Sequence, residues 1–318
     1  MTEKQPDKPG KSPGEGPTSV EGLLERAVWG ALEQDWAAVI KDFEAVLSAD
    51  PKARFEGRLA DAYARTGDDP AAEREFEREL ALKGDDSFLL AGRAEFRRGR
   101  GDLQGARGDL LKAAELRPGE SSLWAALAGV EYELGDYETA LSHIADALDG
   151  SPGYWPYLHS RAELLFRLGR WTYAETDFTI VLDLIGDNAS CLRPRQQAYC
   201  RRGWARFLTR QEGALEDLQK AVVLDPLDTL ALCYRGVARC ARKDAKAGDD
   251  FDAALRIDPG LAMAYAFRGD FRLHIAGDKQ AALEDYRKAL ELEPELKDTI
   301  ERLRSKEPEG PADGAPSE

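Results

Sequence analysis

Small and large apolar residues recur along this chain with a period of 34 residues. Four alanines each precede a large apolar residue by four positions. These pairs are Ala72 with Phe76, Ala106 with Leu110, Ala140 with Ile144, and Ala174 with Phe178. A spacing of four places both side chains of a pair on one face of a helix. The pattern predicts a repeating helix that packs closely against a neighbour.

Each period also contains a second helix and a residue that stops it. A turn glycine keeps the same step at Gly67, Gly101, Gly135 and Gly169, and an apolar helical segment precedes it. A proline or glycine then closes each unit, at Pro51, Gly84, Pro118, Pro152, Gly186, Pro226, Pro259 and Pro294. Proline removes a backbone donor and glycine accepts the left-handed cap conformation, so both end helices. The predicted unit is an antiparallel helical hairpin.

The fourth unit, SSLWAALAGVEYELGDYETALSHIADALDGSPGY, resembles the tetratricopeptide repeat family. It carries the family's residues at Trp124, Leu127, Ala128, Gly135, Tyr137, Ala140, Ala147 and Pro152. By period the chain has eight repeats, at about 20–52, 53–86, 87–120, 121–154, 155–188, 196–228, 229–261 and 262–296. The resemblance implies an all-α, right-handed superhelical solenoid of about eight hairpins with a concave groove.

Changes in composition mark the ends of the repeat region. A Pro- and Gly-rich leader, residues 1–17, is expected to be disordered, and Thr18 to Glu21 form a capping-box pattern. The solenoid is expected over residues 18–306, with a C-terminal capping helix at 295–306. The acidic tail, residues 307–318, is expected to be disordered.

The period breaks between the fifth and sixth repeats. An insertion at residues 185–195 contains the sequence IGDNASCLRP. In the sixth and seventh repeats the turn is about one residue short and lacks Gly-Asp. An extended loop is the simpler interpretation of the insertion, because loops between helices tolerate added residues. A recognition loop, or a hinge between two subdomains, is the alternative.

Charge and cysteine content narrow the classes of partner and compartment. The chain has 59 acidic and 44 basic residues, a net charge of -15. Nucleic acid is not expected as a partner, because its binding requires Lys and Arg that neutralise phosphates. Without a signal peptide or a membrane-spanning apolar run, we expect a cytoplasmic protein with no membrane partner. The cysteines are expected to be buried, reduced thiols; they are Cys191, Cys200, Cys233 and Cys240.

No motif in the chain carries recognisable catalytic chemistry. No pair among the three histidines has metal-ligand spacing, and the P-loop, HExxH and GxSxG motifs are absent. Asp249, Asp250 and Asp252 lack the spacing of a calcium loop and are interpreted as a solvated helix start. The protein is therefore not expected to be an enzyme, and no catalytic residue, cofactor or metal is predicted.

The groove that the resemblance implies collects arginines and aromatic residues. The side chains expected to face it are those of Arg54, Arg58, Asp61, Arg65, Arg98, Tyr132, His159, Arg167, Trp204 and Phe207. The spacing of Arg54, Arg58 and Arg65 predicts that they share one helical face. Because arginine forks bind carboxylates, one hypothesis is that the groove binds an acidic or C-terminal peptide. In the alternative, these arginines pair locally with Asp61 and Glu56.

The resemblance implies a protein scaffold or adaptor that binds a partner peptide or helix in the groove. The carboxylate clamp of some family members uses Lys and Asn on consecutive repeats. It is not expected here, because the single asparagine, Asn188, lies in the insertion. A sensor or regulatory module that binds a small signal peptide or ligand is the alternative function. The oligomeric state is left open.

Overall fold

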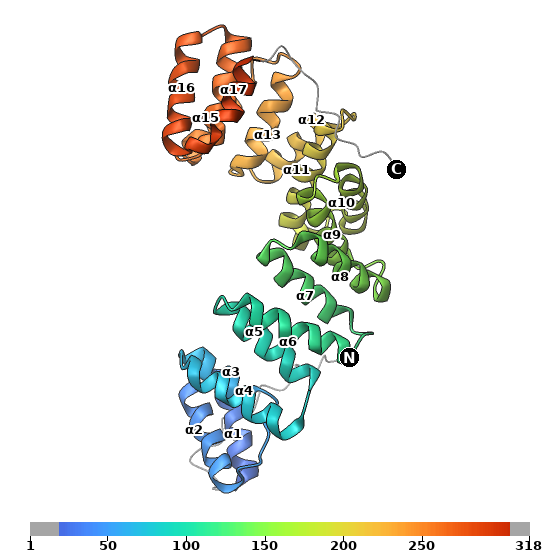
Figure 1. Ribbon diagram of the computed structural model, residues 1–318, viewed down its shortest axis with the longest axis vertical. Helices are drawn as coiled ribbons and strands as arrows, with labels where there is room; N and C mark the ends of the chain where they lie inside the picture. The colour runs from blue at the N-terminus through green and yellow to red at the C-terminus, as the bar shows by residue number, and fades with distance from the viewer. Residues whose placement is uncertain (1–18, 306–318) are drawn as a thin grey trace, which may run out of the picture. The chain divides into compact units, whose positions relative to one another are not determined.

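A computed structural model describes residues 19–305, and every regular element within that range is a helix (Figure 1). The chain divides after Gly150 into two compact units. The predicted leader and tail, residues 1–17 and 307–318, lie outside the described residues. The prediction of an all-α repeat fold built from helical hairpins is confirmed.

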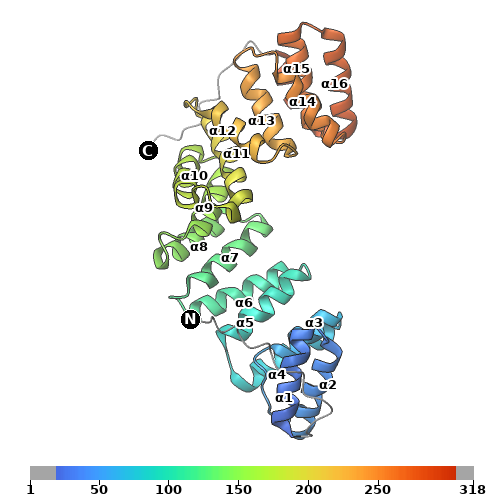
Figure 2. The same cartoon turned by 180° about the vertical axis from the view of Figure 1, so that it is seen from behind.

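The first unit consists of four hairpins between residues 19 and 150. Their helices are α1 (Val20–Glu33) and α2 (Trp36–Ala49), α3 (Arg58–Thr66) and α4 (Asp69–Lys83), α5 (Ser87–Gly99) and α6 (Leu103–Leu116), α7 (Ser121–Leu134) and α8 (Tyr137–Gly150). Both views show the two helices of a pair, such as α5 and α6, side by side (Figures 1 and 2). Gly67 and Gly135 adopt left-handed φ angles of 84° and 80° and cap the first helices of their hairpins.

The second unit repeats this arrangement between residues 151 and 305. Its helices are α9 (Trp155–Arg167) and α10 (Trp171–Ile185), α11 (Leu192–Leu208) and α12 (Ala214–Leu224), α13 (Thr229–Cys240) and α14 (Ala247–Ile257), α15 (Ala262–Phe271) and α16 (Lys279–Leu292), and finally α17 (Lys297–Ser305). Short 3-10 turns lie at Ala189–Cys191 and Pro294–Leu296, and a π-helix lies at Arg272–Ala276.

The periodic alanines and large apolar residues form the core of the hairpins. Ala106, Ala140 and Ala174 are fully buried, as is the ring of Phe178. Alanine lets the two helices approach, and the large residue four positions later fills the space between them. Burial of each such large side chain contributes about 1.5–3 kcal/mol to stability.

The insertion is mainly helical, and the expected extended loop is not formed. After α10 ends at Ile185, the side chain of Asn188 accepts a hydrogen bond from the Ser190 amide and starts the 3-10 turn. α11 then begins at Leu192, and Arg195 holds the turn through the Gly186 carbonyl at 3.1 Å. The added residues therefore lengthen a helix. The boundary between the compact units lies after Gly150, away from this segment.

The cap of the first helix lies one residue later than the pattern predicts. Ser19 is the N-cap of α1, and its hydroxyl accepts a hydrogen bond from the Gly22 amide at 3.2 Å. The sequence pattern placed Thr18 and Glu21 in these two roles. Thr18 itself lies outside the described residues.

Candidate partner-binding groove

A groove of about 730 Å³ opens in the first unit among α1, α3 and α5. Its lining is mostly apolar, with Val28, Leu32, Trp36, Phe43, Phe76, Phe88, Leu89 and Phe96. Two of these side chains, Leu32 and Phe88, are 70% exposed. Large apolar groups at this exposure, gathered around one concave surface, are typical of interaction sites.

The groove is open because α3 is short. Residues 51–57 form a loop that ends with Glu56 and Gly57 in left-handed conformations, with φ 52° and 79°. The buried carboxylate of Glu79 holds this loop, accepting hydrogen bonds from the Phe55 amide at 3.0 Å and the Gly57 amide at 3.2 Å. As a result α3 has 9 residues, whereas α1 has 14. The first helices of this unit contact one another sparsely within the described residues, which leaves room between them.

Missing side chains at two glycines deepen the groove. A Cβ atom on Gly57 would lie 3.2 Å from the ring of Phe76, and one on Gly92 would lie 3.4 Å from it. Both contacts are at or inside ordinary van der Waals distance. Glycine at these positions therefore keeps the space above the Phe76 ring clear.

The arginines that line the groove differ in how they are engaged. Arg65 donates a hydrogen bond to Asp61 at 2.7 Å and lies 4.7 Å above the Trp36 ring. Local pairing, the alternative considered from the sequence, thus describes Arg65. Arg58 is exposed and forms no ion pair or hydrogen bond with its side chain among residues 19–305. Arg58 is therefore available to an external anion.

Arg54 does not share a helical face with Arg58, so that prediction is wrong. It lies in the loop before α3, because the left-handed residues Glu56 and Gly57 interrupt the helix that its spacing suggested. Arg54 instead lines a smaller cavity of about 240 Å³. Arg58 lines both cavities, and so do Val28 and Phe43 of the neighbouring hairpin, so the two spaces adjoin.

In the third and fourth hairpins, the side chains predicted to face the groove contact neighbouring side chains. Arg98 of α5 donates to Glu133 of α7 at 2.9 Å. Tyr132 packs against Tyr137 with the ring centroids 5.4 Å apart. The first contact links two neighbouring first helices, α5 and α7, and the second links the two helices of the fourth hairpin.

In the second unit, the predicted residues pack mainly into aromatic contacts. His159 lies edge-on to Phe178 at 5.8 Å, and burial lowers its pKa. Trp204 stacks with both Phe207 and Tyr234, at 5.1 and 4.1 Å. Arg167 is exposed at the end of α9 and makes contacts of its own. The structure therefore places Arg58, Asp61 and Arg65 at one open groove in the first unit. The other four predicted residues lie in the second unit; they are His159, Arg167, Trp204 and Phe207.

A set of buried ion pairs, which the sequence analysis did not identify, joins the two helices of most hairpins. In each, an arginine of the first helix forms a two-point contact with a buried aspartate of the second. The pairs are Arg26–Asp42, Arg93–Asp109, Arg161–Asp177, Arg202–Asp217, Arg235–Asp250 and Arg268–Asp285. We call these pairs the hairpin clasps. Planar guanidinium and carboxylate groups suit this two-point geometry.

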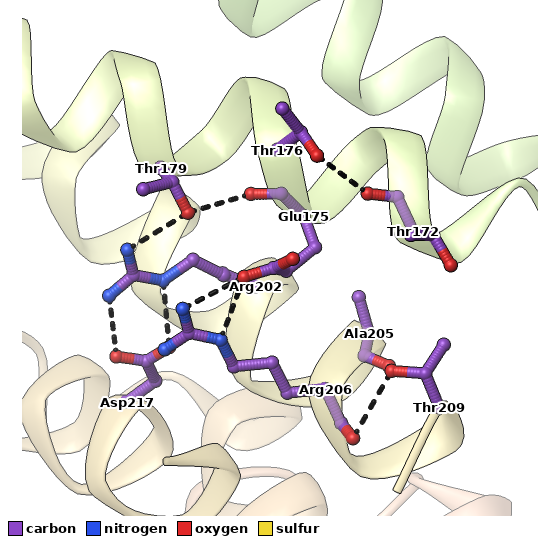
Figure 3. A network of polar contacts seen from close by, with 9 residues as sticks. All are labelled: Thr172, Glu175, Thr176, Thr179, Arg202, Ala205, Arg206, Thr209 and Asp217. Carbon is purple, nitrogen blue, oxygen red and sulfur yellow. Dashed lines mark hydrogen bonds and ion pairs between the residues drawn. The ribbon is translucent and has the colours of Figure 1, made fainter. Parts of the chain in front are cut away.

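The clasp of the sixth hairpin also reaches the preceding hairpin. Figure 3 shows Arg202 and Arg206 of α11 converging on Asp217 of α12, with Arg206 also donating to Glu175 of α10. The two guanidiniums are mostly buried and their charges are matched by two carboxylates. Such contacts tie one hairpin to the next within the second unit.

The solvated helix start predicted at Asp249, Asp250 and Asp252 is wrong for Asp250, whereas Asp249 and Asp252 are exposed. Asp250 is buried and accepts hydrogen bonds from Arg235 and Arg239. Asp252 pairs with Arg268 at 2.6 Å. These carboxylates face the arginines of adjacent first helices, and this contact cannot be read from the local charge run.

The fourth hairpin replaces the clasp with a different pair. Glu131 of α7 is fully buried and lies 2.7 Å from the Nδ1 atom of His143 on α8. Arg107 of α6 approaches the same carboxylate at 3.4 Å. In this hairpin the acidic residue is on the first helix and the basic residue is on the second, which is the reverse of the order in the hairpin clasps.

The described residues also bear on metal binding, membrane-spanning helices and the cysteine thiols. Within residues 19–305, no group of three or more His, Cys, Asp or Glu side chains is arranged to hold a metal ion. No helix in that range is both long and apolar enough to cross a bilayer. All four cysteines are free thiols, and Cys240 alone is only half-buried. Burial raises the pKa of Cys200, Cys233 and Cys240 to about 12.

Comparisons with known proteins agree with the repeat architecture. Tetratricopeptide repeat family models match residues 89–154 and 260–296. Comparison with curated proteins finds no match. A solved tetratricopeptide repeat protein from Parabacteroides merdae ATCC 43184 is similar over 90% of this chain and 99% of its own, with a TM-score of 0.51 and 18% identity.

Two further solved structures share the fold. The C-terminal part of a TPR repeat-containing protein from Cytophaga hutchinsonii matches 77% of this chain and 98% of its own, with a TM-score of 0.55 and 16% identity. A chain of the APC/C hetero-tetramer Cut9-Hcn1 matches 90% of this chain and 56% of its own, also with a TM-score of 0.55 and 16% identity. The in-phase hairpins and the two family matches show that the chain contains tetratricopeptide repeats.

Proposed function

We propose that this protein is a scaffold or adaptor that binds a peptide segment or helix of a partner protein in the groove of the first unit. Tetratricopeptide repeats support protein–protein interaction in general. The observation that carries the specific proposal is the apolar groove, with Leu32 and Phe88 exposed beside the unpaired Arg58.

The groove suits a segment that has apolar side chains and an acidic group. Burial of Leu32 and Phe88 under a partner would contribute up to about 1.5–3 kcal/mol each. Arg58 would then donate a charge-assisted hydrogen bond to a carboxylate, either of a side chain or of a C-terminus. The net charge of -15 disfavours acidic partners at long range, but screening limits that repulsion to about 8 Å at physiological ionic strength.

Arg65 and Asp61 would form the second wall of this site. Their ion pair is half-exposed, with side-chain exposures of 53% and 54%. Exposed pairs contribute at most about 1 kcal/mol, so a partner carboxylate can exchange for Asp61 at little cost. We infer that Arg65 also holds the Trp36 ring in place as an apolar contact.

Selection from a displayed library of random twelve-residue peptides tests the proposal. The full chain is compared with Phe88→Ser and with the control Leu227→Ser, because both side chains are 70% exposed and Leu227 lies in the second unit. We expect the wild type and the control to enrich the same peptides. Phe88→Ser should bind them at least about tenfold more weakly, since it removes most of one apolar contact. Equal enrichment by all three proteins, with unchanged helical circular dichroism, would rule out the groove.

A sensor that binds a small ligand or short signal peptide is the second candidate. The observation in its favour is the groove volume of about 730 Å³, which falls in the range of small-molecule sites. The two candidates differ in their dependence on ligand length. For a scaffold, shortening a selected peptide from twelve residues to four should abolish its thermal stabilisation of the protein, whereas for a sensor the stabilisation should persist.

A further inference from the structure

We propose that the smaller cavity between Arg54 and Arg58 is an anion subsite, which takes an oxyanion of the partner segment next to its apolar contact. The oxyanion is a carboxylate or a phosphoryl group on a side chain. This inference rests on the proposed function of the adjoining groove and identifies the group that the groove selects for.

The position of the cavity links it to the groove. It has a volume of about 240 Å³ and shares Val28, Phe43, Glu56 and Arg58 with the larger space. A segment whose apolar side chain lies beside Phe88 in the larger groove can therefore place a neighbouring side chain in the smaller cavity. Leu24 and Phe55 supply further apolar wall. Apolar walls lower the local dielectric and strengthen an ion pair formed between them.

The arginines of this cavity are the unengaged ones. Arg54 and Arg58 are both exposed, and neither side chain forms an ion pair or hydrogen bond within the described part of the chain. The other two arginines of the larger groove are engaged: Arg65 by Asp61, and Arg100 by Asp69 at 2.8 Å. Two free guanidiniums at one cavity offer several donors in fixed forks, which match the oxygens of a carboxylate or a phosphoryl group.

The acidic groups of the cavity do not neutralise both arginines. The carboxylate of Glu79 is turned to the backbone, where the amides of Phe55 and Gly57 donate to its two oxygens. Burial also raises its pKa, against the effect of those two hydrogen bonds. Glu56 is exposed and lines both cavities, and Lys83 pairs with Asp86 at 2.8 Å. Neither acid of the cavity forms an ion pair with Arg54 or Arg58 within the described residues, so both guanidiniums remain available to a ligand.

Charge reversal of each arginine tests the subsite on the full chain. The probe is a twelve-residue peptide enriched by the wild type that carries one Asp or Glu beside an apolar residue. Arg54→Glu and Arg58→Glu should each weaken its binding about ten- to a hundredfold, the effect of losing a charge-assisted hydrogen bond. Arg74→Glu is the matched control, since Arg74 is exposed, has no polar partner among residues 19–305 and lies outside both cavities.

Changes in the peptide complete the experiment. Replacing its acidic residue by Gln or Asn should weaken binding by a similar factor, and replacing it by phosphoserine shows whether a phosphoryl group or a carboxylate binds more tightly. Equal binding of the neutral peptide, or an unaffected Arg54→Glu variant, would overturn the subsite. If Phe88→Ser abolishes binding in that case, the groove stands without the subsite. If Phe88→Ser has no effect, the proposed function fails as well.

Discussion

In most hairpins a buried aspartate of the second helix is held by an arginine of the first. Burial removes the aspartate and, in most pairs, much of the arginine from water, and the two-point contact compensates for this cost without a large net gain. The energetic consequence is asymmetric. A hairpin tolerates the intact pair, but loss of one partner leaves an uncompensated charge in the interior.

Removal of Asp217 should therefore be strongly destabilising. Asp217 is 2% exposed and is the common acceptor for Arg202 and Arg206 (Figure 3). We expect Asp217→Ala to lower the free energy of unfolding by about 3–5 kcal/mol, the cost of breaking a buried ion pair from one side. Urea unfolding followed by circular dichroism measures this loss.

The preceding residue provides the control. Glu216 is 70% exposed and pairs with Lys220 across one turn of α12. Glu216→Ala should leave the free energy of unfolding nearly unchanged, because exposed pairs contribute little. Similar losses in the two variants would contradict the role assigned to the clasp.

Cysteine reactivity is a second property that burial determines at single residues. Burial raises the pKa of Cys200, Cys233 and Cys240 to about 12, because it disfavours the charged thiolate. At pH 8 almost no thiolate is present at these sites, and the thiolate is the reactive form. We expect these three thiols to resist a disulfide reagent at pH 8 in the folded protein and to react in 8 M urea. Mass spectrometry of labelled peptides distinguishes the sites, and rapid native labelling of Cys200 or Cys233 would contradict the assignment.

At the residue scale, apolar positions were predictable and charged contacts were not. Ala106 and Phe178 could be assigned to the core because their spacing follows the helix period. The spacing of the clasp aspartates does not indicate that they are buried, since a charged residue on a helix is usually solvated. Asp250 was misinterpreted for that reason. The signal available in the sequence was the recurrence of an arginine followed by an aspartate 15 to 17 positions later.

At the scale of helices and turns, the number of positions between the two clasp residues follows the length of the connection between their helices. The paired residues lie 16 positions apart in the first, third and fifth hairpins. They lie 15 apart in the sixth and seventh, whose turns are short, and 17 apart in the eighth. In the eighth hairpin the π-helix Arg272–Ala276 contains the added residue. The pairing is thus conserved in space while the chain length between its members varies.

Deleting the exposed His274 from the π-helix should be tolerated. The deletion converts the π-turn to an α-turn and restores the spacing of 16 between Arg268 and Asp285. We expect a change of no more than about 1 kcal/mol, within the range of surface substitutions and turn changes. Thermal unfolding followed by circular dichroism is the measurement.

Deletion of Glu284 in the same hairpin is the comparison. It would rotate Asp285 by about 100° around α16, away from Arg268, and would displace Tyr286 from the core. The expected loss is at least about 3 kcal/mol, because a buried charge loses its partner. Equal effects of the two deletions would mean that the π-helix does not absorb the added residue.

The existence of the helices could be predicted from the sequence, but the start of α3 could not. Period and terminators locate the hairpins to within a few residues. The late start of α3 depends on Glu79, which lies more than twenty positions away and binds the amides of Phe55 and Gly57. No local pattern reports such a contact, and so Arg54 was placed on a helix that does not extend to it.

At the scale of the whole molecule, the two units differ in how their first helices are engaged. In the first unit the groove beside α3 is lined by exposed apolar groups and an unpaired Arg58. In the second unit Trp204 is stacked with Tyr234, and Arg201 lies near both Glu163 and the Phe166 ring. The sequence predicted contact residues in both units. The partner-binding proposal concerns the groove of the first unit.

Hydrogen exchange of the full chain with a selected twelve-residue peptide tests this central claim most directly. Binding in the groove should slow exchange in α1, α3 and α5, because an occupied groove restrains the helices that line it. Phe88→Ser should remove that protection, and Leu227→Ser should retain it. Protection confined to α9, α11 and α13, with none in the first unit, would contradict the account.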